Sequence, residues 1–190
     1  MKNIKLFTLL FVLAGVTFSS CRKESFFDPE EQFEAEKPII ENYVKANIPD
    51  AIKHENTGIW YEILETADEN EDPYEYTIHS SGYINNVDIE IKYRGVLLDG
   101  TVFDSNTEGV TFSLGELIRA WQVMFLPKTI GDLPVGGILE EGLQKGMKVR
   151  FVTPSYYAYQ HIGQGNVPAN APLDFTIEVL DIRDPVTPQE

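Results

Sequence analysis

The sequence predicts an α+β fold in which a bent antiparallel β-sheet wraps around a short helix, with an N-terminal helical extension. In the last two thirds of the chain, apolar and polar residues alternate with a period of two over 89–93, 147–151 and 173–179, which predicts half-buried strands. A short segment between these strands, Glu116 to Trp121, favours a helix. Strands separated by so little helix are typical of an antiparallel sheet.

A helix is also expected over residues 30–47. Its apolar residues recur at roughly helical spacing, namely Phe33, Ile39, Ile40, Tyr43 and Val44. Pro38 interrupts the stripe, and Pro49 ends it. The helix either packs on the flank of its own domain or serves as an arm for dimerisation or client binding. We favour the first, because amphipathic helices usually cover their own domain.

Two further segments precede the strands described above. Gly58 to Leu64 is rich in strand-forming residues. It is followed by an acidic stretch, 66–73, whose carboxylates lack the ligand spacing and central glycine of a calcium-binding loop. We interpret this stretch as a solvated loop.

Composition excludes several classes of function. The chain has 190 residues, with 15 Lys and Arg against 30 Asp and Glu and a net charge of −15. Such a charge argues against nucleic acid as a partner, because phosphate backbones are bound by basic residues. The three His are scattered without ligand spacing, and no phosphate-binding loop or nucleophile motif occurs. We therefore expect no cofactor and no metal.

The N-terminus predicts export and lipid anchoring. A basic start is followed by an apolar run from Leu6 to Phe18, too short for a stable membrane span and typical of a signal peptide. The sole Cys follows at once, and 18–21 resembles the lipobox of bacterial lipoproteins, with Phe18 in place of the usual aliphatic residue. The resemblance implies that Cys21 is acylated and tethers the protein to a bilayer in the cell envelope. A plain secretory signal is the alternative.

These segments define the domain organisation that we expect. It comprises a lipoprotein signal peptide at 1–20, a tether and N-terminal helix at 21–57, a folded domain at 58–184 with an insertion at about 122–141, and a tail at 185–190. Cleavage before Cys21 would remove two Lys and no acids, which leaves 13 − 30 = −17. The mature protein would be strongly acidic.

Four motifs in fixed order carry a family resemblance. They are Ile91 to Ser105, Phe112 to Gly115, Leu117 to Trp121, and the segment from Gly146 to Ile182. Together they resemble the FKBP-type peptidyl-prolyl cis-trans isomerases, and the N-terminal helix before a Gly-x-x-Tyr strand is similar to the secreted bacterial branch. The resemblance covers roughly half of the chain, and its first motif is highly specific.

The resemblance implies a binding pocket and roles for its residues. The residues implied in catalysis are Tyr93, Phe103, Asp104, Trp121, Tyr159 and Phe175, and those implied in substrate binding are Leu117, Ile118 and Val167. Trp121 would form the floor, and the Ile118 main chain with the Tyr159 hydroxyl would hold the substrate backbone. Asp104 would orient and act electrostatically, although a turn residue is the structural alternative. Phe112 would support the pocket from behind.

The implied activity fits these residue types. An X-Pro amide isomerises slowly, because twisting its C–N bond breaks resonance against a barrier of about 18–20 kcal/mol. An apolar pocket favours the twisted, less polar amide over the planar one. The implied function is isomerisation of X-Pro bonds in exported polypeptides, the expected clients. The alternative is a non-catalytic peptide-binding or chaperone module of the same fold.

The alternative is suggested by departures from the family pattern. Gln160 replaces a glycine that can adopt positive φ, and Ala120 replaces the glycine before Trp121. The stretch after Trp121 is about fifteen residues longer than in compact members. We hypothesise that this excursion borders the cleft, because it leaves directly from Trp121.

Overall fold

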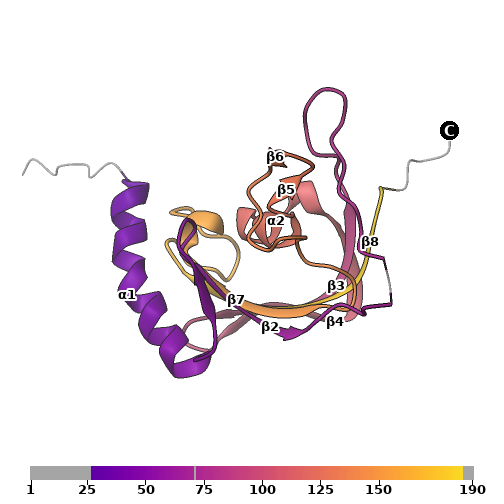
Figure 1. The fold of residues 1–190 in the computed structure, drawn as a ribbon. Helices are drawn as coiled ribbons and strands as arrows, with labels where there is room; N and C mark the ends of the chain where they lie inside the picture. Colours follow the sequence, from indigo (N-terminus) through magenta and orange to yellow (C-terminus); the bar gives the residue numbers. More distant parts are fainter. Residues whose placement is uncertain (1–26, 71, 186–190) are drawn as a thin grey trace, which may run out of the picture.

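The structure is a computed structural model that describes residues 27–70 and 72–185. Six strands form one antiparallel sheet in the order β1–β2–β7–β8–β3–β4, and it curves around α2 (Figure 1). Their bounds are Ile52–His54 (β1), Ile59–Glu65 (β2), Asp88–Leu97 (β3), Val102–Ser113 (β4), Lys148–Thr153 (β7) and Leu173–Arg183 (β8). This arrangement confirms the predicted α+β fold. In the part of the chain that the structure describes, no helix is long and apolar enough to cross a membrane.

The helix inside the curve of the sheet lies later in the sequence than expected. The predicted segment Glu116 to Trp121 splits into a 3-10 turn, Leu114–Glu116, and the helix α2, Arg119–Phe125. α2 continues past Trp121 because Val123, Met124 and Phe125 are all buried in the main core. The first four residues of the predicted insertion, 122–125, are therefore part of the central helix.

The rest of the excursion folds against the end of α2. It forms a small hairpin of β5, Thr129–Ile130, and β6, Leu133–Pro134, on the same side of the sheet as the helix (Figure 1). The N–H groups of Ile138 and Leu143 donate to the carbonyls of Val123 and Met124, at 2.9 and 3.0 Å. The last carbonyls of a helix have no partner within it, so this segment satisfies groups that would otherwise be unpaired.

The N-terminal helix, α1, spans Pro29–Asn47 and packs on its own domain. Because side chains alternate along a strand, Phe151 faces the main core whereas Val152 faces the opposite side of the sheet. Ile40 and Val44 of α1 cover Val152 there and form a second, smaller core. The helix continues through Pro38, which is exposed and so interrupts the apolar stripe but not the helix.

The boundary predicted at residue 57 is also shifted. β1, Ile52–His54, lies within the segment assigned to the tether and helix, yet it pairs with β2 as the edge strand of the sheet. It was missed because it has only three residues, too few for an alternating pattern to be recognised. Residues 1–26 and 186–190, which contain the predicted signal peptide and Cys21, lie outside the described part of the chain.

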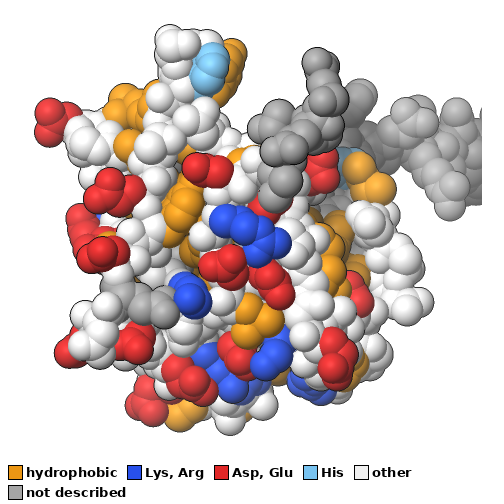
Figure 2. Space-filling model, turned by 90° about the vertical axis from the view of Figure 1, so that its right-hand side faces the viewer, with side chains coloured by type: hydrophobic (Ala, Val, Ile, Leu, Met, Phe, Trp, Pro, Cys, Tyr) orange, Lys and Arg blue, Asp and Glu red, His pale blue; other side chains and the backbone are white. Residues whose placement is uncertain are grey.

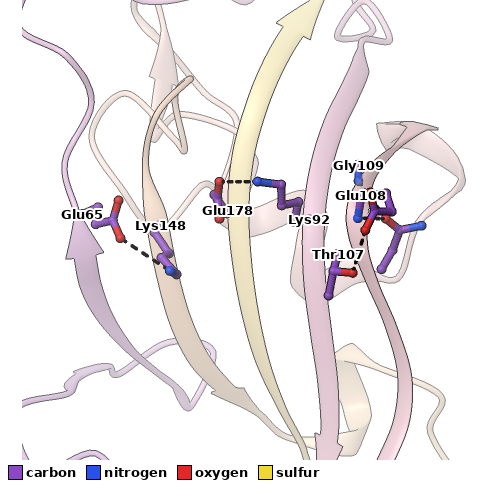
Figure 3. A network of polar contacts seen from close by, with 8 residues as sticks. Glu65, Lys92, Thr107, Glu108, Gly109, Lys148 and Glu178 are labelled. Atoms are coloured by element: carbon purple, nitrogen blue, oxygen red, sulfur yellow. Dashed lines mark hydrogen bonds and ion pairs between the residues drawn. The ribbon is translucent and has the colours of Figure 1, made fainter.

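Ion pairs cross the sheet on the face opposite the main core. Lys148 of β7 pairs with Glu65 of β2 at 3.4 Å, and Lys92 of β3 pairs with Glu178 of β8 at 3.0 Å (Figure 3). Such partly exposed pairs contribute roughly 0–1 kcal/mol each. This polar face therefore adds little stability compared with the two apolar cores.

Gly58 tests the contact between α1 and the sheet. Its φ is +68°, and a Cβ there would lie 2.8 Å from Cζ of Phe33 in α1. We expect Gly58→Ala to lower the free energy of unfolding by about 2–3 kcal/mol, from the left-handed backbone and from the clash together. Gly82→Ala is the control, because φ is +86° and no atom lies within 4 Å. Gly82→Ala should lower the free energy of unfolding, measured by urea titration, by only about 1 kcal/mol. Equal losses would show that Phe33 does not pack as described.

Candidate active site

Eight of the nine residues that the sequence implicated converge on one cavity. Its volume is about 150 Å³, and side chains of α2 and of the sheet strands β3, β4 and β8 line it. The lining residues are Tyr93, Phe103, Asp104, Phe112, Leu117, Ile118, Trp121, Tyr159 and Phe175. They come from β3, β4, α2, β8 and the two loops beside them, so only the folded sheet brings them together.

Edge-to-face aromatic contacts form the floor of the cavity. The Trp121 ring meets Phe175 at 5.4 Å and 89° and Tyr93 at 5.3 Å and 73°, between ring centroids. The Phe103 ring meets Phe175 at 5.6 Å and 88°. These geometries are the favourable T-shaped ones, and each such pair is worth about 0.5–1.5 kcal/mol beyond burial. The rings are therefore fixed in place before a ligand arrives.

Gly95 makes room for one of these rings. It lies on β3, opposite Asp104 of β4, and a Cβ on it would lie 2.5 Å from Cζ of Phe103. Only glycine allows the Phe103 ring to lie over the strand at this point. Gly95, within the first of the four sequence motifs, is thus required by the packing of Phe103.

The polar groups of the cavity are two phenols and a carboxylate. The Tyr93 hydroxyl donates to Oδ2 of Asp104 at 2.7 Å. Burial, and then the hydrogen bond to Asp104, raises the pKa of the Tyr93 phenol. Burial, with the Asp104 charge second, also raises the pKa of the Tyr159 phenol. Both phenols are therefore protonated at neutral pH and can act as hydrogen-bond donors.

The loop before α2 is held by a side chain of the helix. Gln122 donates from Nε2 to the carbonyl of Leu117 at 2.8 Å, which fixes the rim of the cavity beside Ile118. The Ile118 carbonyl accepts from the N–H of Trp121 at 3.0 Å at the start of the helix. Ala120, where the family pattern has glycine, lies inside α2, and alanine is the better helix former.

Gln160, in the turn that carries Tyr159, takes the positive φ that a glycine could adopt there. Gln160 adopts φ of +52°, the left-handed conformation that glycine would take at least cost. Its N–H donates to the Ser155 carbonyl at 2.9 Å, and its own carbonyl accepts from Asn170 N–H at 2.7 Å. These bonds hold Gln160 in the strained left-handed conformation, which the glycine of the family pattern could also adopt.

Two placements differ from the expected roles. Val167 is buried in the main core and is not among the lining residues of the cavity. Phe112, expected only behind the pocket, lines the cavity directly. Its ring lies 6.3 Å from that of Trp121 and 6.0 Å from that of Tyr93.

The excursion does not line the aromatic cavity, contrary to our hypothesis. Gly136 instead lines a neighbouring hollow with Tyr157 and Gln160. The cause is the backbone pairing with the C-terminal end of α2, whereas the cavity lies at its N-terminal end.

A larger cavity, of about 720 Å³, lies elsewhere and is lined by many carboxylates. Its carboxylates include Asp68, Glu69, Asp72, Glu140, Glu141 and Asp181. Within 27–70 and 72–185, no group of His, Cys, Asp or Glu is arranged to hold a metal ion. Figure 2 shows one face of the molecule, where acidic side chains are widely spread, in line with the net charge of −15.

Comparison with known proteins decides the family. The profile described as FKBP-type peptidyl-prolyl cis-trans isomerase matches residues 84–180. The chain belongs to the FKBP family. The matched range contains all the cavity-lining residues of β3, β4, α2 and β8.

Two curated FKBP-type relatives each match about half of the chain. The FKBP-type peptidyl-prolyl cis-trans isomerase FkpA of Aeromonas hydrophila is 36% identical over 100 residues, which cover 51% of this chain and 32% of that protein. A probable FKBP-type 25 kDa peptidyl-prolyl cis-trans isomerase of Pseudomonas aeruginosa is 34% identical over 96 residues, covering 50% and 36%. The match thus spans about a third of the length of each relative.

A solved peptidyl-prolyl cis-trans isomerase has a similar fold. The crystal structure of a peptidyl-prolyl cis-trans isomerase from Pseudomonas syringae pv. tomato superposes with a TM-score of 0.53, covering 84% of this chain and 99% of that one. The sequence identity is 23%, so the likeness concerns the fold alone.

Gln160 gives a test of the left-handed turn. We expect Gln160→Gly to raise the free energy of unfolding by about 0.5 kcal/mol, because relief of the strained φ exceeds the entropy cost of glycine. Gln160→Val should lower it by about 1–2 kcal/mol, since a β-branched residue is poorly tolerated there. Asn170→Gly is the matched control, with φ of +57° at a residue type that accepts this region, and should change little. A loss of stability in Gln160→Gly would contradict the strained geometry.

Proposed function

We propose that this protein is a peptidyl-prolyl cis-trans isomerase that binds the proline of an X-Pro segment in the aromatic cavity. The observation that carries the proposal is the cavity of about 150 Å³ with the Trp121 indole as its floor. A cavity of about 150 Å³ lined by apolar side chains accommodates a benzene molecule, so a pyrrolidine ring fits. Family membership supports the same activity.

The mechanism needs no cofactor, because no bond to the amide is made or broken. The cavity would take up the proline ring and exclude water from the amide, which favours the twisted state with its less polar carbonyl. The Tyr159 phenol and the Ile118 main chain would hold the substrate backbone at the rim. Asp104 orients the Tyr93 phenol through their hydrogen bond and supplies negative charge beside the cavity.

The non-catalytic alternative rested on Gln160 and on the excursion after Trp121. Gln160 retains the backbone conformation expected of glycine, and the excursion leaves the cavity open. Both reasons for doubting catalysis are therefore weakened. A binding module without catalysis would still retain affinity for X-Pro peptides, which makes the two functions separable by rate.

Turnover of short X-Pro peptides by the purified full chain tests the activity. We expect accelerated cis-to-trans conversion, and a loss of kcat/KM of at least about ten-fold in Trp121→Ala, because the floor of the cavity is removed. Asp104→Asn should lower kcat/KM less. Tyr83→Ala is the control, since it removes an aromatic ring that is 76% exposed and lies outside the cavity. A flat rate with retained peptide binding would establish the recognition module instead.

We further propose that the protein is a lipoprotein of the secreted bacterial branch, anchored in the cell envelope through acylated Cys21. The support is the signal-like sequence 1–20 with a single Cys directly after it. Several acyl chains on one residue are what stable anchoring requires. The clients would then be exported polypeptides with X-Pro bonds.

Metabolic labelling tests the anchor. In cells that express the full chain, we expect a labelled fatty acid to be incorporated and the protein to sediment with membranes. Cys21→Ser should abolish both, whereas Ser20→Ala, beside it, should retain both. Membrane association without incorporation of label would contradict acylation, and a secreted, unlabelled product would establish the plain signal peptide.

Dimerisation through α1 stays a prediction. The apolar face of α1, with Ile40 and Val44, already covers the sheet of its own chain. Ile39, 56% exposed, is the large apolar side chain of α1 left for such a contact. Sedimentation of the full chain against Ile39→Ser would reveal a dimer of this kind.

A further inference from the structure

Glu36 is a buried carboxylate that the site described so far does not use. It lies in the middle of α1, is 1% exposed, and accepts three hydrogen bonds. Gln32 Nε2 donates at 2.8 Å, while the backbone N–H and hydroxyl of Ser155 donate at 2.7 and 2.5 Å. Burying a carboxylate is costly unless it is hydrogen-bonded, so these contacts hold the middle of α1 against Ser155, beside the apolar packing at the second core.

Ser155 is the residue on which the Tyr159 turn is built. It begins the 3-10 turn Ser155–Tyr157, and its carbonyl accepts from the N–H groups of Ala158 and Gln160, both at 2.9 Å. Tyr159 lies between these two donors and reaches the cavity. Ser155 thus faces Glu36 with its N–H and hydroxyl and fixes the turn with its carbonyl.

The turn cannot cap its own beginning. The residue before it is Pro154, which has no side-chain acceptor, and the turn has no local side-chain cap. Glu36 supplies the missing acceptor from another element, 119 positions earlier in the chain. Phe33, one turn before Glu36 on the same helix, packs over Gly58 close to Pro154 and holds the same junction.

We propose that Glu36 is a positioning residue for the isomerase: by holding Ser155 it sets the turn that presents Tyr159 to the substrate, so α1 is part of the working site. The proposal rests on the proposed function and deepens it. Glu36 itself lies outside the cavity and touches no substrate.

The first test compares Glu36→Ala with two variants of the full chain. Val44→Ala is the matched control, because it weakens the docking of α1 at the second core, away from Ser155. Glu36→Gln should retain kcat/KM, since a carboxamide oxygen can still accept from the Ser155 N–H. We expect kcat/KM to fall about five-fold in Glu36→Ala and to stay within about two-fold of the native value in Val44→Ala and Glu36→Gln. All are measured at a temperature at which every variant is folded. Equal losses in Glu36→Ala and Val44→Ala would overturn the proposal.

A double-mutant cycle shows whether Glu36 acts through Tyr159. In a Tyr159→Phe background, Glu36→Ala should cause less than about a two-fold further loss of kcat/KM, because the hydroxyl that it positions is absent. A full, additive loss would mean that Glu36 acts elsewhere, and would overturn the proposal.

Hydrogen exchange separates this proposal from the activity itself. Glu36→Ala should speed the exchange of the Ala158 and Gln160 amides at least about ten-fold, whereas Val44→Ala should not. If the native chain does not accelerate isomerisation, the proposed function fails on that result alone. The double-mutant cycle with Tyr159→Phe is then repeated with the affinity for an X-Pro peptide as its readout, measured by the change in tryptophan fluorescence on binding. Unchanged exchange in Glu36→Ala would overturn the positioning role whatever the activity.

Discussion

The indole of Trp121 packs edge-on against Phe175 and Tyr93, and the candidate site depends on this packing. It joins α2 to β8 and β3 and forms the floor of the cavity. Its Nε1 is buried without a hydrogen-bond partner among the described residues, which costs about 1–3 kcal/mol. Burial of 150–250 Å² of ring surface contributes roughly 4–6 kcal/mol at 25 cal/mol per Å². The gain from burying the ring exceeds the cost of the unpaired Nε1, so the indole remains buried.

The two faces of the sheet pack against different parts of the structure. The concave face holds the main core and the cavity, while the opposite face carries α1 over Val152 and a set of partly exposed ion pairs. The turn after β7 lies where these two parts meet. It contributes Tyr159 to the cavity on one side and Ser155 to Glu36 on the other. In this way α1, which covers the convex face of the sheet, can set the position of Tyr159 at the cavity on the concave face.

The motifs predicted most of the site because they are local and chemically specific. The strand around Tyr93, the Phe103–Asp104 pair and the Leu117 to Trp121 segment each line the cavity. Val167 was placed there by motif order alone, but its side chain is directed into the core. The end of α2 was misjudged because the motif ends at Trp121, whereas the buried side chains of Val123, Met124 and Phe125 extend the helix beyond it.

Other features could not be derived from spacing. Glu36 falls at an apolar position of its helix, three residues after Phe33 and four before Ile40, and an acid in such a stripe is a signal of a buried partner. That partner, Ser155, is too distant in sequence to be found without the fold. The conformation of Gln160 was equally hidden, because positive φ in a glutamine is imposed by tertiary hydrogen bonds, not by propensity.

The central claim is that proline binds over the Trp121 ring in the small aromatic cavity, not in the larger acidic one. The most direct measurement is NMR of the full chain with a short X-Pro peptide. We predict upfield ring-current shifts of the proline ring protons and nuclear Overhauser contacts from them to Trp121 and Phe175. Contacts confined to Tyr74 and Met147, which line the acidic cavity, would contradict the account.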